Sequence, residues 1–170
     1  MSKVKVMVAL RDKTSTEELT SLACQLAAGM GGELIALHVI QIPLATSLEA
    51  KDEVIDQEEK EILAEATRIA TGKVSGGFST DLVRARNTGD AIIAEAREQG
   101  VDLLVLGHRR QHELSEFLFG STMRHVAHHA PCKVIVQIPA PSPPKTQTEP
   151  VKGSAFLAQA WVDCPGGITL

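Results

Sequence analysis

Two glycine-containing turns carry the residues best suited to binding chemistry. They are Gly107-His108-Arg109-Arg110 and Gly120-Ser121-Thr122, and nine residues separate them. The first turn follows an apolar run, where a glycine lets a ligand approach the backbone, and the second opens a predicted helix, whose free N–H groups suit phosphate oxygens. This arrangement indicates a phosphate-binding site. The structural alternative is that Gly107 ends a strand and Ser121 caps a helix.

The charge near these turns is locally positive, although the chain is acidic. It has 17 Lys and Arg against 21 Asp and Glu, which gives a formal net charge of −4. The stretch from Glu49 to Glu61, with seven acids and two lysines, accounts for this charge, and we interpret it as the solvated face of a helix. Between positions 107 and 133, two acids stand against five of the six histidines and four bases, namely Arg109, Arg110, Arg124 and Lys133. This local excess favours an anionic ligand.

Three further patterns suggest other chemistry, and each lacks a required part. His125, His128 and His129 include an i,i+4 pair that suits zinc, but no glutamate follows the first histidine and no third ligand is evident, so we expect no metal. The segment 75–79, Ser-Gly-Gly-Phe-Ser, is similar to the S-G-G-x-D-S loop of ATP pyrophosphatases, yet it precedes a strand and lacks the acid. Ser121 beside His125 has neither a G-x-S-x-G turn nor an orienting acid, which disfavours a hydrolase.

The elements that must position these residues alternate between strand and helix along the chain. Apolar runs predict strands at 4–10, 34–40, 78–85, 101–106 and 134–138. The capping boxes of Thr14 to Glu18 predict the start of the first helix, and Gly29 with Gly31-Gly32 supplies the left-handed stop that ends it. The second helix carries one apolar stripe, the third runs from Asn87 to Gly100, and the fourth runs from Gly120 to Pro131. The stripe consists of Ile55, Ile62, Ala66 and Ile69.

This alternation predicts an α/β fold with right-handed crossovers, in which a parallel sheet carries helices on both faces. Ligands of such sheets bind at the carboxyl ends of the strands, where the strand order reverses. The first and fourth strands commonly lie side by side at that point. We therefore expect Leu10, Arg11 and Asp12 to lie near Gly107.

Composition limits the domain organisation and the classes of function. Aromatic residues make up 3% of the chain, with no Tyr, and the acidic balance also disfavours nucleic acid as a partner. No run suits a membrane span or a signal peptide, and the three cysteines show no C-x-x-C spacing, so we expect a reduced, cytoplasmic protein. From Pro139 onward the sequence becomes proline-rich, which predicts a domain at 1–139 followed by a linker and tail at 140–170.

The two turns resemble the nucleotide motif of the universal stress protein family, whose ATP-binding members carry G-x-x-G, nine residues, and then G-S or G-T after the fourth strand. The resemblance spans residues 3 to 139 and includes Leu37-His38-Val39, Gly89-Asp90, the strand 101–107 and Ala130-Pro131-Cys132. It implies an adenine nucleotide alpha hydrolase-like fold, a three-layer α/β sandwich whose five-stranded parallel sheet has the order 3-2-1-4-5.

The same resemblance implies a function in the stress response. The expected ligand is ATP or another adenine nucleotide, with Mg²⁺ as an optional companion, and it acts as a regulatory ligand. A homodimer through the last strand is expected too. The resemblance gives no reaction and no catalytic residue, so at most slow ATP hydrolysis is expected.

The implied nucleotide site has an adenine end and a phosphate end. Val39 is the expected backbone contact to adenine, and the residues around the phosphates are Gly107, His108, Arg109, Arg110, Gly120, Ser121, Thr122 and Arg11. With no Tyr or Trp in the domain, aliphatic side chains and backbone groups must hold the adenine.

Two positions depart from the family pattern. Arg110 replaces the second glycine and either blocks the site or clamps a phosphate. Arg11 replaces an aspartate, while Asp12 comes one residue late and is expected to point elsewhere. These departures support an alternative function, a dimeric interaction or regulatory domain of the same family that binds no nucleotide.

Overall fold

The structure is a computed structural model that describes residues 3–48, 53–108 and 120–139. Two of the predicted site residues, Arg109 and Arg110, lie outside the described residues, as does the predicted linker and tail at 140–170. None of the helices in the described part is long and apolar enough to cross a membrane.

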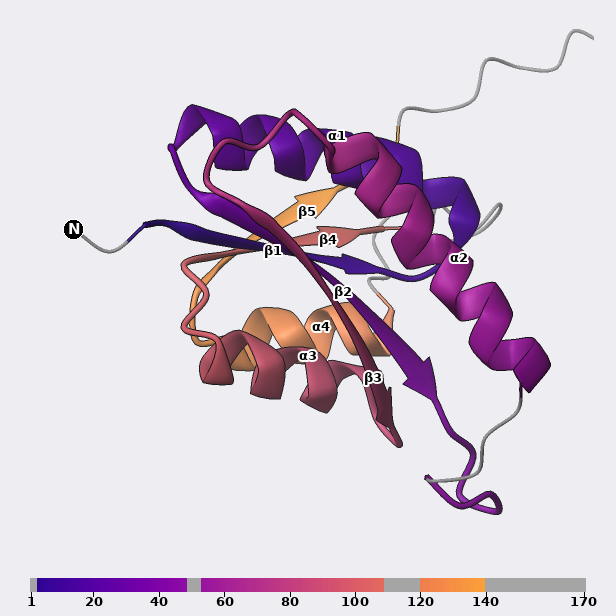
Figure 1. Ribbon diagram of the computed structural model, residues 1–170. Coiled ribbons are helices and arrows are strands. Elements are labelled where there is room, and N and C mark those ends of the chain that lie inside the picture. Colours follow the sequence, from indigo (N-terminus) through magenta and orange to yellow (C-terminus); the bar gives the residue numbers. More distant parts are fainter. Residues whose placement is uncertain (1–2, 49–52, 109–119, 140–170) are drawn as a thin grey trace, which may run out of the picture. The chain divides into compact units, whose positions relative to one another are not determined.

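The described residues form a five-stranded parallel sheet with the order β3-β2-β1-β4-β5, so the predicted strand order is confirmed. Strands and helices alternate along the chain as the sequence predicts (Figure 1). Their bounds are β1 Lys5–Leu10, α1 Lys13–Gly29, β2 Glu33–Gln41, α2 Glu53–Ala70, β3 Phe78–Ala85, α3 Thr88–Glu98, β4 Leu103–Gly107, α4 Ser121–His129 and β5 Lys133–Gln137.

The helices cover both faces of the sheet, with α1 and α2 on one face and α3 and α4 on the other (Figure 1). Successive side chains of β1 alternate between the two apolar clusters, because side chains of a strand point to opposite faces in turn. Val6 and Val8 pack with α1 and α2, whereas Met7 packs with α3 and α4. Burial on both faces explains the nearly continuous apolar runs of the central strands.

The helix boundaries follow local capping chemistry. Asn87 caps α3, as predicted, and Gly31 adopts a left-handed conformation just after α1, with φ of 61°. The predicted start of α1 within Thr14 to Glu18 is wrong, because the helix begins at Lys13 with Asp12 as its N-cap. The Asp12 side chain accepts a hydrogen bond from the Ser15 N–H, which leaves the later capping boxes without that role.

Close backbone contacts hold the amino edge of the sheet, at which the strands begin. A Cβ atom on Gly76 would lie 1.9 Å from the Gly32 carbonyl oxygen, and one on Gly32 would lie 2.3 Å from the Val4 oxygen. The Leu34 N–H also donates to the Gly77 carbonyl. The segment 75–79 is therefore a packing turn at the amino end of β3, opposite the carboxyl ends of the strands, and not a phosphate loop of the pyrophosphatase type.

Candidate functional site

The candidate site lies at the carboxyl edge of the sheet, where β1 and β4 end side by side. Their last residues in register are Ala9 and Leu106, so Leu10 and Gly107 follow on neighbouring strands. The strand order reverses between β1 and β4, which is where open parallel sheets bind ligands. The fourth helix runs antiparallel to the strands, and its first residue, Ser121, therefore lies toward this same edge.

The two glycines of the motif differ in how much space surrounds them. A Cβ on Gly107 would lie 2.6 Å from Cδ1 of the buried Leu19, so a larger residue there would require the Leu19 side chain to shift. Gly120 has no described atom within 4 Å of the same position. It is the N-cap of α4, with φ of −55° and ψ of 157°, and no side chain of the described residues caps the helix there. Glycine itself brings no capping oxygen to the N–H groups of the first turn of α4.

The alternative role of Ser121 as the helix cap is wrong. Gly120 occupies the N-cap position, and Ser121 and Thr122 are the first helical residues. Both side chains are exposed. Their backbone N–H groups and hydroxyls are therefore placed at the end of the helix that carries a partial positive charge.

The backbone direction of β2 gives Val39 a defined orientation. The Glu33 N–H donates to the carbonyl of Val4, which precedes β1, whereas the Leu34 N–H donates to the carbonyl of Gly77, which precedes β3. The backbone groups of odd-numbered β2 residues therefore point toward β1. The last β1 residue in register with β2 is Leu10, opposite His38. The backbone groups of Val39 therefore lie at the end of the paired region, and its side chain packs with the α3 and α4 cluster.

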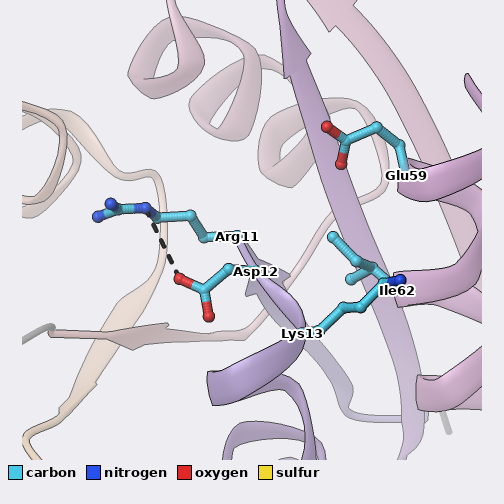
Figure 2. A pocket seen from close by; sticks show the side chains of 5 residues that line it. All are labelled: Arg11, Asp12, Lys13, Glu59 and Ile62. Atoms are coloured by element: carbon cyan, nitrogen blue, oxygen red, sulfur yellow. Dashed lines mark ion pairs between the residues drawn. The ribbon is translucent and has the colours of Figure 1, made fainter. Parts of the chain in front are cut away.

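Arg11 and Asp12 border a pocket of about 350 Å³ next to the end of β1. The Arg11 side chain is 71% exposed, and its Nε lies 3.9 Å from Oδ2 of Asp12 (Figure 2). Lys13, Glu59 and Ile62 complete the lining, so α1 and α2 both contribute. The pocket is lined by both cationic and anionic side chains. Asp12 is turned toward the start of its own helix, which it caps.

The pKa of Asp12 is lowered in the folded protein. Burial by itself raises the pKa of this carboxyl, but hydrogen bonds from Thr14 and Ser15, together with the charge of Arg11, lower it by more. The Thr14 hydroxyl lies 2.6 Å from Oδ1 and the Ser15 backbone nitrogen 3.0 Å from it. The ionised carboxylate is therefore the form that caps α1.

Replacing Asp12 by alanine should lower the free energy of unfolding by about 1 kcal/mol at neutral pH, because the cap is lost. Asp12→Asn, which keeps the accepting oxygen, should cost less. A carboxyl with a lowered pKa contributes stability above its unfolded-state pKa and loses it as the pH falls through the folded-state pKa. Urea unfolding at a series of acidic pH values should show that the wild type loses more stability than Asp12→Asn as the pH falls. If the free energies of unfolding of the two proteins fall in parallel, Asp12 does not have this role.

The cationic cluster seen in the sequence does not gather at one site. Lys133 begins β5 opposite Leu103, at the amino edge, whereas Gly107 pairs with Gln137 at the other edge. The nine residues of α4 span roughly 13 Å. They place His128 and His129 in its last turn, also toward the amino edge. The prediction of a single locally positive region was wrong in this respect, because α4 runs along the strands from the carboxyl edge to the amino edge.

The predicted i,i+4 histidine pair has other contacts. Nε2 of His125 lies 2.6 Å from Oδ1 of Asp90 in α3, and Nδ1 of His129 lies 2.9 Å from the His125 carbonyl oxygen. Within the part of the chain that the structure describes, no group of three or more His, Cys, Asp or Glu is placed to hold a metal ion. The contact with Asp90 joins α4 to the first turn of α3 and is the role that the geometry gives His125.

A model of the universal stress protein family matches residues 4–137, which is most of the chain. This chain belongs to the universal stress protein family. A universal stress protein of Methanothermobacter thermautotrophicus is 29% identical to it over 124 residues, which cover 69% of this chain and 84% of that protein. The family predicted from the sequence is therefore confirmed.

Solved structures of universal stress proteins share the fold. The protein from Archaeoglobus fulgidus in complex with dAMP is 25% identical, has a TM-score of 0.63, and is matched over 80% of this chain and 98% of that one. A universal stress protein in complex with cAMP is 21% identical with a TM-score of 0.61, matched over 82% of this chain and 100% of the other. The second likeness concerns the fold alone. Both agree with the predicted sandwich.

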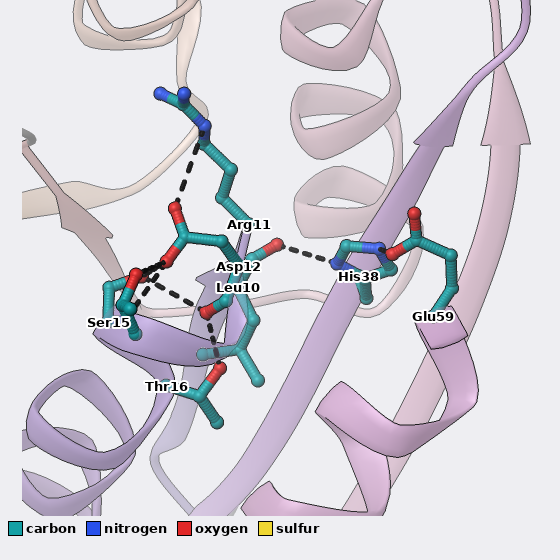
Figure 3. Close-up of polar contacts among 8 residues, drawn as sticks. Leu10, Arg11, Asp12, Ser15, Thr16, His38 and Glu59 are labelled. Atoms are coloured by element: carbon teal, nitrogen blue, oxygen red, sulfur yellow. Dashed lines mark hydrogen bonds and ion pairs between the residues drawn. The ribbon is translucent and has the colours of Figure 1, made fainter. Parts of the chain in front are cut away.

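One polar pair in this universal stress protein was missed by sequence reasoning. Glu59 lies in the acidic stretch that we interpreted as a solvated face, yet its carboxylate contacts Nε2 of His38, whose side chain is only 3% exposed (Figure 3). Nδ1 of His38 lies 2.9 Å from the Leu10 carbonyl oxygen. A histidine in the middle of a buried strand was the available signal, since buried polar groups need partners.

Proposed function

We propose that this chain binds an adenine nucleotide, with ATP as the expected form, as a regulatory ligand at the carboxyl edge of its sheet. The observation that carries the proposal is the start of α4, beside the ends of β1 and β4, where the N-cap is Gly120 and no described side chain caps the first-turn N–H groups. A helix N-terminus of this kind attracts phosphate through its N–H groups and its dipole. The complexes of relatives with dAMP and cAMP support the same class of ligand.

In this proposal the nucleotide lies along the edge from β2 to α4. The phosphates contact the N–H groups at Gly120, Ser121 and Thr122, while the adenine contacts backbone groups of Val39. Gly107 and His108 line the path between them, and the His108 N–H is held by the Gln137 carbonyl at 2.8 Å, which fixes the start of this turn.

Cations complete the proposed site. The Arg11 guanidinium, exposed beside the end of β1, adds positive charge for a phosphate. Arg109 and Arg110 fall in the same turn of the sequence and would act in the same way. Mg²⁺ would accompany ATP by binding phosphate oxygens.

Calorimetric titration with ATP, ADP, AMP and adenosine, each with and without Mg²⁺, tests the proposal. Affinity should increase with the number of phosphates, because the helix terminus and the arginines act on the anionic part of the ligand. Absence of heat and of any thermal shift at millimolar nucleotide would contradict the proposal. Phosphate release over long incubation separates slow ATP hydrolysis from simple binding.

The second candidate is a dimeric interaction domain without nucleotide. It is favoured by β5, an edge strand among the described strands, whose apolar residues Val134, Ile135 and Val136 are half-buried and are followed by Ile138 at 51% exposure. A second copy pairing with this edge would cover those side chains. If nucleotide titration gives no heat and light scattering gives the mass of a dimer, this candidate is favoured over the first.

A further inference from the structure

His38 joins three elements at the carboxyl edge. Its ring comes from β2, its Nδ1 faces the carbonyl oxygen of Leu10 at the end of β1, and its Nε2 faces the carboxylate of Glu59 on α2. Figure 3 shows the ring between these two partners. The ring is 3% exposed and the Glu59 side chain 27%, so the histidine is buried while the carboxylate side chain is partly exposed.

The two partners determine how many protons the pair must hold. A carbonyl oxygen only accepts hydrogen bonds, so Nδ1 has to carry a hydrogen. An ionised carboxylate also only accepts, and then Nε2 has to carry one too, which makes the ring an imidazolium. If the carboxyl group is protonated instead, it donates to Nε2 of a neutral ring. In both arrangements the His38–Glu59 pair holds one proton more than a neutral imidazole beside an ionised carboxylate.

Loss of that proton turns the contact from attraction into repulsion. The lone pair of Nε2 would then face a carboxylate oxygen with no hydrogen between them, and the buried Nε2 would lose its partner. Because Nδ1 remains bound to Leu10, the ring stays with the sheet. The side chain that can move is Glu59, which reaches in from α2.

The other charged groups near the pair are largely matched with one another. On the side of β1 and α1, Arg11 lies beside Asp12, and Lys13 contacts Glu61 of α2. On β3, Arg84 lies two residues beyond Leu82, which packs on the same face of the sheet and is in register with His38. The two ion pairs bring little net charge to the His38–Glu59 contact, and Arg84 is a further cation on the same face of β3.

We propose that His38 and Glu59 form a proton-operated latch that holds α2 against the carboxyl edge of the sheet. While the proton is present, Glu59 is fixed and closes one side of the pocket that it lines with Arg11, Asp12, Lys13 and Ile62 (Figure 2). When the proton leaves, Glu59 is released and the middle of α2 loosens from β2. The latch does not depend on nucleotide binding, although it borders the edge where we place the nucleotide.

Nitrogen NMR of the His38 ring combined with amide hydrogen exchange tests the latch on the intact protein, over about pH 5 to pH 8, where histidines ordinarily change charge. As the ring signals report loss of the proton, protection of the amides around Glu59, corrected for intrinsic exchange, should fall by at least about tenfold. Protection in α3 should not change in step. If the ring loses its proton and the protection of α2 does not change, this measurement on the wild-type protein alone overturns the proposal.

Glu59→Gln provides the specific variant. Its amide N–H can donate to Nε2 of a neutral ring, so the contact persists without the extra proton, and the pH dependence of α2 protection should disappear. Glu61→Gln is the matched control, because Glu61 pairs with Lys13 and not with His38. It should retain the wild-type pH dependence. Equal pH dependence in Glu59→Gln and Glu61→Gln would also overturn the latch.

Discussion

Replacing Gly120 by aspartate is expected to weaken nucleotide binding by about 10- to 100-fold while the protein stays folded. No described atom lies within 4 Å of a Cβ at this position, and the backbone conformation there suits an N-cap aspartate. The new carboxylate would accept the N–H groups of the first turn of α4, which are the donors proposed for phosphate. Its negative charge would also repel the phosphates. Calorimetry on both proteins measures the change.

Two controls make this result specific. Gly120→Ser adds a neutral capping oxygen, and it should weaken binding much less than the aspartate does. Adenosine, which has no phosphate, should bind both variants as it binds wild type. If Gly120→Asp binds ATP as tightly as wild type, the phosphates do not lie at the start of α4, and the proposed orientation of the nucleotide is wrong.

Replacing Gly76 by alanine is expected to lower the free energy of unfolding by about 3 kcal/mol or more. The added Cβ would lie 1.9 Å from the carbonyl oxygen of Gly32 and 2.4 Å from its carbonyl carbon. Both are backbone atoms, so no side-chain rotation relieves the clash. The Gly32 backbone cannot retreat easily either, because its own Cβ position lies 2.3 Å from the Val4 oxygen. Relief therefore requires the start of β2 and the turn before β3 to separate.

Gly29→Ala is the matched control for this prediction. Gly29 is the last residue of α1, and no atom in the described part of the chain lies within 4 Å of its Cβ position, leaving out the helix's own backbone. Alanine there should leave stability unchanged or raise it by up to about 1 kcal/mol, since alanine favours helix more than glycine does. Urea unfolding of both variants gives the comparison. A loss below about 1 kcal/mol for Gly76→Ala, no larger than an average substitution, would show that this contact is not close.

Most of the fold could be predicted because it depends on patterns within short stretches. The alternation of apolar runs and helical spacing gives the elements, and Asn87 and Gly31 mark helix ends through their own backbone chemistry. The strand order came from the family resemblance, since local sequence does not say which strands are neighbours. The start of α1 was placed too late because Asp12 and the capping boxes that follow it competed for the same role, and the sequence alone does not rank them.

The candidate site was predictable only where it depends on one turn. Gly120 at the start of α4 follows from the motif and its spacing. The separation of Lys133 from that turn does not, because sequence distance says nothing about which edge of the sheet a residue reaches. The pairing of Glu59 with His38 depends on the rotation of α2 about its axis over β2, and an acidic stretch on a helix gives no information about that rotation.

The contrast between the two edges of the sheet has a consequence for how such a protein can change. At the amino edge, backbone touches backbone at Gly32 and Gly76, and few other residue types fit. At Gly120, on the carboxyl edge, no atom of the described residues lies within 4 Å of the corresponding Cβ position. Substitutions at Gly120 can therefore change the chemistry of the carboxyl edge without disturbing the backbone contacts of the amino edge on which folding depends.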